Sequence, residues 1–242
     1  MDEQRICSSV FAPGCERMLR APTWCHPDEW IVDYGRRTGP SLRKDLPEHF
    51  LRTLAASPAS DIRVAVLAHP DTPVDLVDRM LDDRASDVRR SAVGRTTDVV
   101  ALRSAARDEW TIRHAVASNP NTPADLLEAL SRDRDQHVRV AVVLNPSTPR
   151  RLVDAAVGSK LDHVRWWALQ RTTSQKLMRG AAASADTENR SWLAGNPNLP
   201  LDVLTALATD PSHGIRYRVA TNPICPPELR ERLVATLDPG PA

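Results

Sequence analysis

Three cysteines near the start of this 242-residue chain are the residues best suited to metal chemistry. Cys7, Cys15 and Cys25 are spaced C-x7-C-x9-C, and His26 adjoins the third. Thiolates and imidazoles bind zinc, and cysteine thiolates hold iron–sulfur clusters. The tightly spaced cysteine pairs of zinc ribbons and ferredoxins are missing, so we expect no cofactor. A zinc or iron–sulfur site at Cys7, Cys15 and Cys25 remains the alternative.

Catalytic motifs are absent from the sequence. It contains no nucleophile elbow, P-loop, dinucleotide fingerprint or H-E-x-x-H pattern, and its seven histidines are scattered. We therefore expect that the protein is not an enzyme.

One arginine recurs at intervals of 24 to 26 residues, and it defines seven repeats: Arg63, Arg89, Arg113, Arg139, Arg165, Arg190 and Arg216. We number positions within a repeat from this arginine as zero. A row of cations could bind phosphates. However, an acid shortly precedes each arginine: Asp61, Asp87, Glu109, Asp135, Asp162, Glu188 and Asp210. The pattern therefore favours charge-assisted bonds between neighbouring repeats.

Position +6 is usually Asn or His followed by Pro, as in Asn119, Asn145, Asn196 and Asn222. Asn before Pro is typical of a turn, so we interpret this row as structural rather than ligand-binding. Repeats two and five instead carry Arg-Thr-Thr, beginning at Arg95 and Arg171, and also place Arg103 and Arg179 at +14. Either a duplicated three-repeat block carried a neutral variant, or these arginines form two basic patches that bind an acidic partner.

Aromatic residues gather at +1 and +2 of the last three repeats in a chain that is only 4% aromatic; they are Trp166, Trp167, Trp192 and Tyr217. Interfaces often use such residues. A locally bulkier core is the alternative interpretation.

Two helices per repeat must position these side chains. Apolar residues at +13 and +17 predict one face of a helix that begins at +10 and lasts about three turns. Position +9 is mostly an N-cap type, as in Thr72, Asp98 and Thr148, and Pro follows it in most repeats, though not after Asp98. A second, shorter helix is predicted from about −1 to +5, for example over 62–68, because Pro at +7 ends it. Single pairs cannot bury their apolar stripe, so stacked repeats must cover each other.

Four segments follow from this pattern. Residues 1–39 form a small irregular element with three of the four cysteines, and 40–60 form a capping half repeat in which Pro47, Phe50, Leu51 and Leu54 match the second helix. The array covers 61–237, and 238–242 are a flexible tail. The expected fold is all-α, a HEAT-like α-solenoid.

The stretches from Ile112 (IRHAVASNPNTPADLLEAL) and Val138 (VRVAVVLNPSTPRRLVDAA) resemble the leucine-rich repeat variant family. The resemblance implies a right-handed superhelix of paired helices without strands, in which one helix of each pair is of 3₁₀ type. Some members of that family carry an amino-terminal cysteine-bound iron–sulfur cluster.

Charge and hydropathy narrow the possible partners. The formal net charge is +1, so no overall field favours nucleic acid. No signal peptide is visible and no window approaches the roughly 20 apolar residues of a membrane span, so we expect a cytoplasmic protein. The leading hypothesis is a non-enzymatic protein–protein interaction scaffold that binds near the aromatic cluster. The alternatives are a nucleic-acid-binding solenoid that uses Arg90, Arg103, Arg107 and Arg179, and a metal or iron–sulfur sensor.

Overall fold

The computed structural model describes residues 31–35 and 39–237. Helices follow one another in pairs along the chain, which confirms the predicted all-α solenoid class. The chain divides into two compact units, Met1–Asn121 and Thr122–Ala242, which we call the N-terminal unit and the C-terminal unit.

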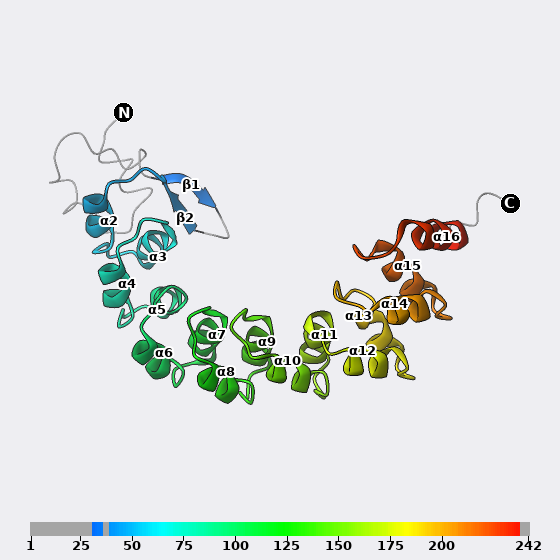
Figure 1. Ribbon diagram of the computed structural model, residues 1–242. Helices are drawn as coiled ribbons and strands as arrows, with labels where there is room; N and C mark the ends of the chain where they lie inside the picture. Colours follow the sequence, from blue (N-terminus) through cyan, green and yellow to red (C-terminus); the bar gives the residue numbers. More distant parts are fainter. Residues whose placement is uncertain (1–30, 36–38, 238–242) are drawn as a thin grey trace. The chain divides into compact units, whose positions relative to one another are not determined.

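In the N-terminal unit the helices form two layers (Figure 1). The first helices of successive repeats pack side by side, α3 on α5 and α5 on α7, and the second helices lie in the other layer. The elements are α2 (Glu48–Leu54), α3 (Ser60–Ala68), α4 (Val74–Met80), α5 (Ser86–Val93), α6 (Val99–Ala105) and α7 (Trp110–Ser118).

The C-terminal unit repeats this arrangement. Helix α11 packs between α9 and α13, while α12 packs on α14 in the second layer. The elements are α8 (Ala124–Leu130), α9 (Gln136–Leu144), α10 (Arg150–Ala156), α11 (Asp162–Arg171), α12 (Gln175–Ala182), α13 (Thr187–Leu193), α14 (Leu201–Ala208), α15 (His213–Thr221) and α16 (Pro227–Leu237).

The predicted helix lengths were wrong. From α3 to α12 the first helix of each pair is the longer one: α3 has nine residues and begins at −3, whereas α4 has seven. In the last two pairs the second helix is the longer one, and α16 has 11 residues. A polar side chain before each first helix explains the early start, since Asp83 Oδ1 accepts a bond from the Ala85 N–H just ahead of α5. Helix α4 ends after two turns, because the turn that contains Asp83 and Ala85 follows it directly. Both helices are α-helical, so the 3₁₀ type that the resemblance implied is not found in the described residues.

The predicted N-cap role of the +9 threonines was also wrong. The cap position of α4 belongs to Pro73, without a side-chain bond. Thr72 instead turns backwards, and its hydroxyl donates to the carbonyls of Val66 and His69. Carbonyls freed at the end of the first helix need donors, and a hydroxyl supplies one. Asp98 does cap α6, where it accepts from the Val100 N–H.

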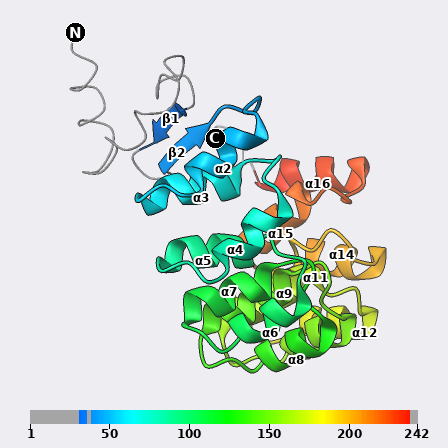
Figure 2. The same cartoon turned by 90° about the vertical axis from the view of Figure 1, so that its left-hand side faces the viewer.

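A two-stranded antiparallel sheet that the sequence pattern did not reveal precedes the helices, with strands β1 (Ile31–Gly35) and β2 (Gly39–Leu42). Strand β2 packs on α3, and Figure 2 shows the two side by side. Helix α2 follows Pro47 and buries Leu51 and Leu54. The apolar face of α3 is thus covered where no earlier helix pair is available.

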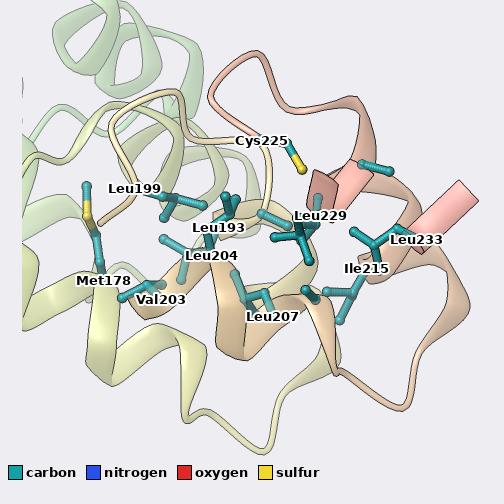
Figure 3. Close-up of a cluster of buried hydrophobic side chains, with 14 of the residues drawn as sticks. Met178, Leu193, Leu199, Val203, Leu204, Leu207, Ile215, Cys225, Leu229 and Leu233 are labelled. Carbon is teal, nitrogen blue, oxygen red and sulfur yellow. The ribbon is translucent and has the colours of Figure 1, made fainter. Parts of the chain in front are cut away.

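Aliphatic side chains fill the space between the layers. Figure 3 shows the core of the C-terminal unit, where Met178, Leu193, Leu204, Leu207 and Ile215 are fully or almost fully buried. Both the +13 and the +17 positions contribute, as predicted, through Val203 and Leu207. Each fully buried side chain of this size stabilises the fold by about 1.5 to 3 kcal/mol.

A hydrogen-bond ladder at +6 joins successive repeats. Asn196 Nδ2 donates to the carbonyls of Leu169 (2.7 Å) and Thr172 (2.9 Å) in the preceding repeat, and Asn222 and Asn119 do the same within their units. The amide oxygen of Asn196 also accepts from the Asn198 N–H at 2.7 Å. The predicted turn is therefore confirmed, and the same side chain additionally fixes the repeat before it.

We predict that Asn196→Ala lowers the free energy of unfolding by about 1 to 3 kcal/mol, because it leaves buried carbonyls of another repeat without donors. Urea denaturation measures this change. The exposed Asn198→Ala serves as the matched control and should leave the midpoint unchanged, since only the Asn198 backbone takes part in the turn. Equal midpoints for the two variants would contradict the ladder's role in stability.

Candidate functional site

Several arginines at position zero form ion pairs between repeats. Arg63 binds both carboxylate oxygens of Asp83 in the next repeat, at 2.7 and 2.8 Å, and its Nη1 donates to the Ser57 carbonyl. Arg190 pairs with Asp210 in the same way, at 2.7 Å from Nε. Both pairs are largely buried. These guanidinium groups are structural, as the sequence pattern indicated.

The acids that pair with these arginines are only partly those predicted. Asp210 was identified correctly, but Arg63 pairs with Asp83 rather than Asp87, whose carboxylate accepts from Ser60. Asp162 bonds to Arg165 of its own repeat at 2.7 Å. The partner of position zero therefore lies 20 residues downstream, at the start of the next repeat's turn, where stacking brings it beside the guanidinium group.

Ion pairing shifts the titration of the buried acids. The hydrogen bonds from Arg63 hold the pKa of Asp83 below its ordinary value, although burial opposes the shift. Burial acts to raise the pKa of Asp210, but bonds from Arg190 and from the Ser212 N–H outweigh it, so this pKa also lies below its ordinary value.

Arg-Thr-Thr replaces Asn in the ladder of repeats two and five. Arg95 donates to the carbonyls of Leu67 and His69, and Arg171 donates to those of Val143 and Asn145, which are the carbonyls that an Asn at +6 would reach. The following threonines, Thr96 and Thr172, accept the turn bond that the Asn oxygen accepts elsewhere. Two residues thus divide the two functions of one Asn.

The two arginines at +14 lie on the second helices. Arg179 is exposed and pairs with Asp202 of the next repeat, with 2.8 Å between Nε and the carboxylate. Arg103 is exposed on α6. Arg95 and Arg171 thus bind ladder carbonyls, whereas Arg179 joins two second helices. The two predicted basic patches stay a prediction.

The aromatic cluster is divided between core and surface. Trp166 and Trp167 are half-buried, with ring centroids 4.6 Å apart, and Trp167 packs on Val143, Val164 and Ala168. Trp192 packs on the core of the C-terminal unit beneath Arg165, whose Cζ lies 5.1 Å from the ring centroid. Tyr217 is 57% exposed. The bulkier-core interpretation therefore describes Trp167 and Trp192, and Tyr217 is available to a partner.

Tyr217 borders a surface hollow of about 830 Å³ at the end of the C-terminal unit, which we call the α15–α16 hollow. Val234, from α16, is 52% exposed beside it. The lining residues are His213, Tyr217, Ala220, Thr221, Pro223, Arg230 and Val234. The hollow combines apolar walls with a few polar groups, which is the usual character of a recognition site.

Arg230 lines the α15–α16 hollow and holds the backbone beside it. Its Nε donates to the Ala220 carbonyl at 3.1 Å, and its Nη2 donates to the carbonyls of Asn222 and Cys225. Ala220 and Asn222 stand at +4 and +6, so Arg230 takes the carbonyls that the +6 side chain of a following repeat would take. The turn that carries Pro223 is held in place by this arginine.

The proposed cysteine site, Cys7, Cys15 and Cys25, lies outside the residues that the structure describes. Cys225 is a buried free thiol in the core of the C-terminal unit, in the slot where other repeats have Thr. In residues 31–35 and 39–237, no three His, Cys, Asp or Glu side chains form a group that could hold a metal ion. None of the helices described there has the length and apolar character to cross a membrane.

Sequence reasoning missed the α15–α16 hollow and Arg230. Arg230 belongs to α16 rather than to the recurring positions, so no column pointed to it. One signal was available. In the ladder each repeat supplies donors to carbonyls of the preceding repeat, so the carbonyls around Asn222 also need a donor from a later residue.

Paired helices, a carbonyl ladder and buried inter-repeat ion pairs define a helical repeat scaffold. The model of the family described as "Leucine rich repeat variant" matches residues 110–135, the length of one repeat. A solved structure titled as a leucine-rich repeat variant with a novel repetitive protein structural motif is similar in fold, with a TM-score of 0.52 and 22% identity over 77% of this chain and 80% of that one. No curated protein matches the chain. The resemblance to the leucine-rich repeat variant family is thus confirmed.

We predict that Asp83→Asn destabilises the protein at neutral pH by about 1 to 3 kcal/mol, because Arg63 loses its buried charge partner. The folded pKa of Asp83 is lowered, so its contribution is complete above about pH 4, the ordinary Asp value, and is lost as the pH falls through the folded value. Urea midpoints of wild type and variant should therefore converge in acid.

Asp82→Asn is the matched control, because Asp82 is the exposed neighbour of Asp83. Its urea midpoint should follow that of the wild type from neutral to acidic pH. A gap between Asp83→Asn and wild type that stays constant down to the lowest pH would contradict the ion-pair explanation.

Proposed function

We propose that this protein is a non-enzymatic interaction scaffold that binds a partner protein at the α15–α16 hollow. The observation that carries the proposal is the hollow itself, with a volume of about 830 Å³ and with Tyr217 and Val234 exposed at its edge. Exposed aromatic and aliphatic groups around a concavity are what protein partners bury at the centre of an interface.

Rigidity supports the same proposal. Arg230 and the Asn222 amide hold the backbone around the hollow through bonds to carbonyls, so little conformational entropy would be lost on binding. A partner could therefore gain affinity from a modest contact area. The cytoplasm, where thiols such as Cys225 stay reduced, is the compartment that we propose for this interaction.

The arginine contacts favour a protein partner over nucleic acid. Of the four arginines in the nucleic-acid alternative, Arg179 pairs with Asp202, and Arg90, Arg103 and Arg107 are exposed. Arg95 and Arg171 donate to backbone carbonyls of the chain itself. Phosphates would have to compete with these internal acceptors. Binding to a protein requires no such exchange.

We predict that Tyr217→Ala and Val234→Asp each reduce partner capture by at least about tenfold, because each removes apolar contact from the centre of the interface. Capture by immobilised wild-type and variant protein, followed by mass spectrometry, measures this loss. Melting temperatures should not change, since both side chains are largely exposed.

Leu201→Asp provides the matched control. Leu201 is 63% exposed in the same unit but is not among the residues lining the hollow, so this variant should capture the partner normally. Equal loss in all three variants would mean that the hollow is not the binding surface. If the material captured on the immobilised protein instead decreases steeply with salt and disappears after nuclease treatment, the ligand is nucleic acid.

A further inference from the structure

Among the recurring arginines at position zero, Arg139 has a side-chain N–H that lacks a hydrogen-bond acceptor. Its Nη1 donates to the Asp133 carbonyl at 2.5 Å. Its Nε is a buried side-chain nitrogen without a hydrogen-bond partner, which no other described side chain shares. An enclosed guanidinium N–H without an acceptor is costly, so this position invites an acceptor from elsewhere.

The missing acceptor can be identified from equivalent positions. The residue 20 places after the column arginine is Asp83 for Arg63 and Asp210 for Arg190, and each carboxylate binds the Nε of its arginine. The residue 20 places after Arg139 is Ser159. The same group is therefore absent in this repeat: a carboxylate at the guanidinium Nε.

Ser159 keeps the backbone geometry of the aspartates that it replaces. Its Oγ accepts from the Leu161 N–H at 3.2 Å, as Asp83 accepts from Ala85 and Asp210 accepts from Ser212, both at 2.8 Å. The next carboxylate along the chain, Asp162, is engaged with Arg165. The turn at Ser159 is thus the same as those at Asp83 and Asp210, but it lacks their carboxylate.

We propose that Arg139 and Ser159 form an anion-binding site for a small carboxylate supplied from outside the chain. The ligand occupies the volume of the absent aspartate carboxyl group and accepts from the Nε–H of Arg139, while the Ser159 hydroxyl donates a second bond. Both residues are half-buried, and the shielding of Nε restricts the site to small anions. The site is separate from the α15–α16 hollow.

Formate and acetate are the probes, with chloride at equal ionic strength as the reference. A ligand that binds only the folded protein raises its melting temperature. We expect formate to raise the melting temperature of wild type by about 2 °C more than chloride does, with saturation. The Ser159→Asp variant carries its own carboxylate and should show no formate-specific rise, while its urea midpoint exceeds that of wild type.

Arg139→Lys is the second variant, because it keeps the charge but removes the Nε–H donor. It should also lose the formate-specific rise. Ser184→Asp is the matched control: Ser184 makes the same turn bond, to Asp186, but the preceding arginine, Arg165, already has partners. This control should respond to formate as wild type does. A rise of equal size in Ser159→Asp, or an equal effect of chloride and formate on wild type, would overturn the proposal.

Discussion

Side-chain donation to the carbonyls at +4 of the preceding repeat is the interaction on which the rest of the structure depends. The first helix of each repeat ends at a proline-containing turn, which leaves its last carbonyls without backbone donors. Because these carbonyls are buried between repeats, a donor must come from the next repeat. The apolar layers supply most of the stabilisation, but burial of apolar surface is not directional. The polar ladder selects one stacking register, as buried polar groups with complete bonding do elsewhere.

The ladder explains which variations the repeats accept. An Asn supplies a donor and an acceptor, and Arg followed by Thr supplies the same two functions from two side chains. His69 is a third solution: its Nε2 lies 2.8 Å from the Arg43 carbonyl, while the Asp71 N–H donates to its Nδ1. The imidazole thus contacts a carbonyl through one nitrogen and accepts the turn bond through the other, as the Asn amide does. Repeats two and five therefore differ in composition but keep the same bonding.

The sequence predicted the repeat period, the two-helix unit and the apolar +13 and +17 positions, because periodicity depends on local spacing alone. It did not predict the partner of Arg63, since Asp83 and Asp87 both lie shortly before the next arginine in sequence and only stacking distinguishes them. Thr72 was misread for a related reason: a hydroxyl can accept at a helix start or donate at a helix end, and the competition between the two is decided in three dimensions. Strand β2 was missed because it lies outside the repeats, so its sequence carries no periodic pattern. Of the residues that line the proposed binding surface, the sequence pointed only to Tyr217, because Arg230 and the hollow depend on the fold of α16.

The end of the ladder and the proposed binding surface have a common physical origin. Within the C-terminal unit, Arg230 supplies to Ala220 and Asn222 the donors that a further repeat would supply. An arginine can do this from a neighbouring helix, whereas an Asn would need a full repeat to carry it into place. Helix α16 packs on α15, and Tyr217 of α15 stays exposed beside Val234 of α16. The α15–α16 hollow therefore lies beside the turn whose carbonyls Arg230 holds. Selection for a partner would need to change only the residues around it, because the ladder already fixes their backbone.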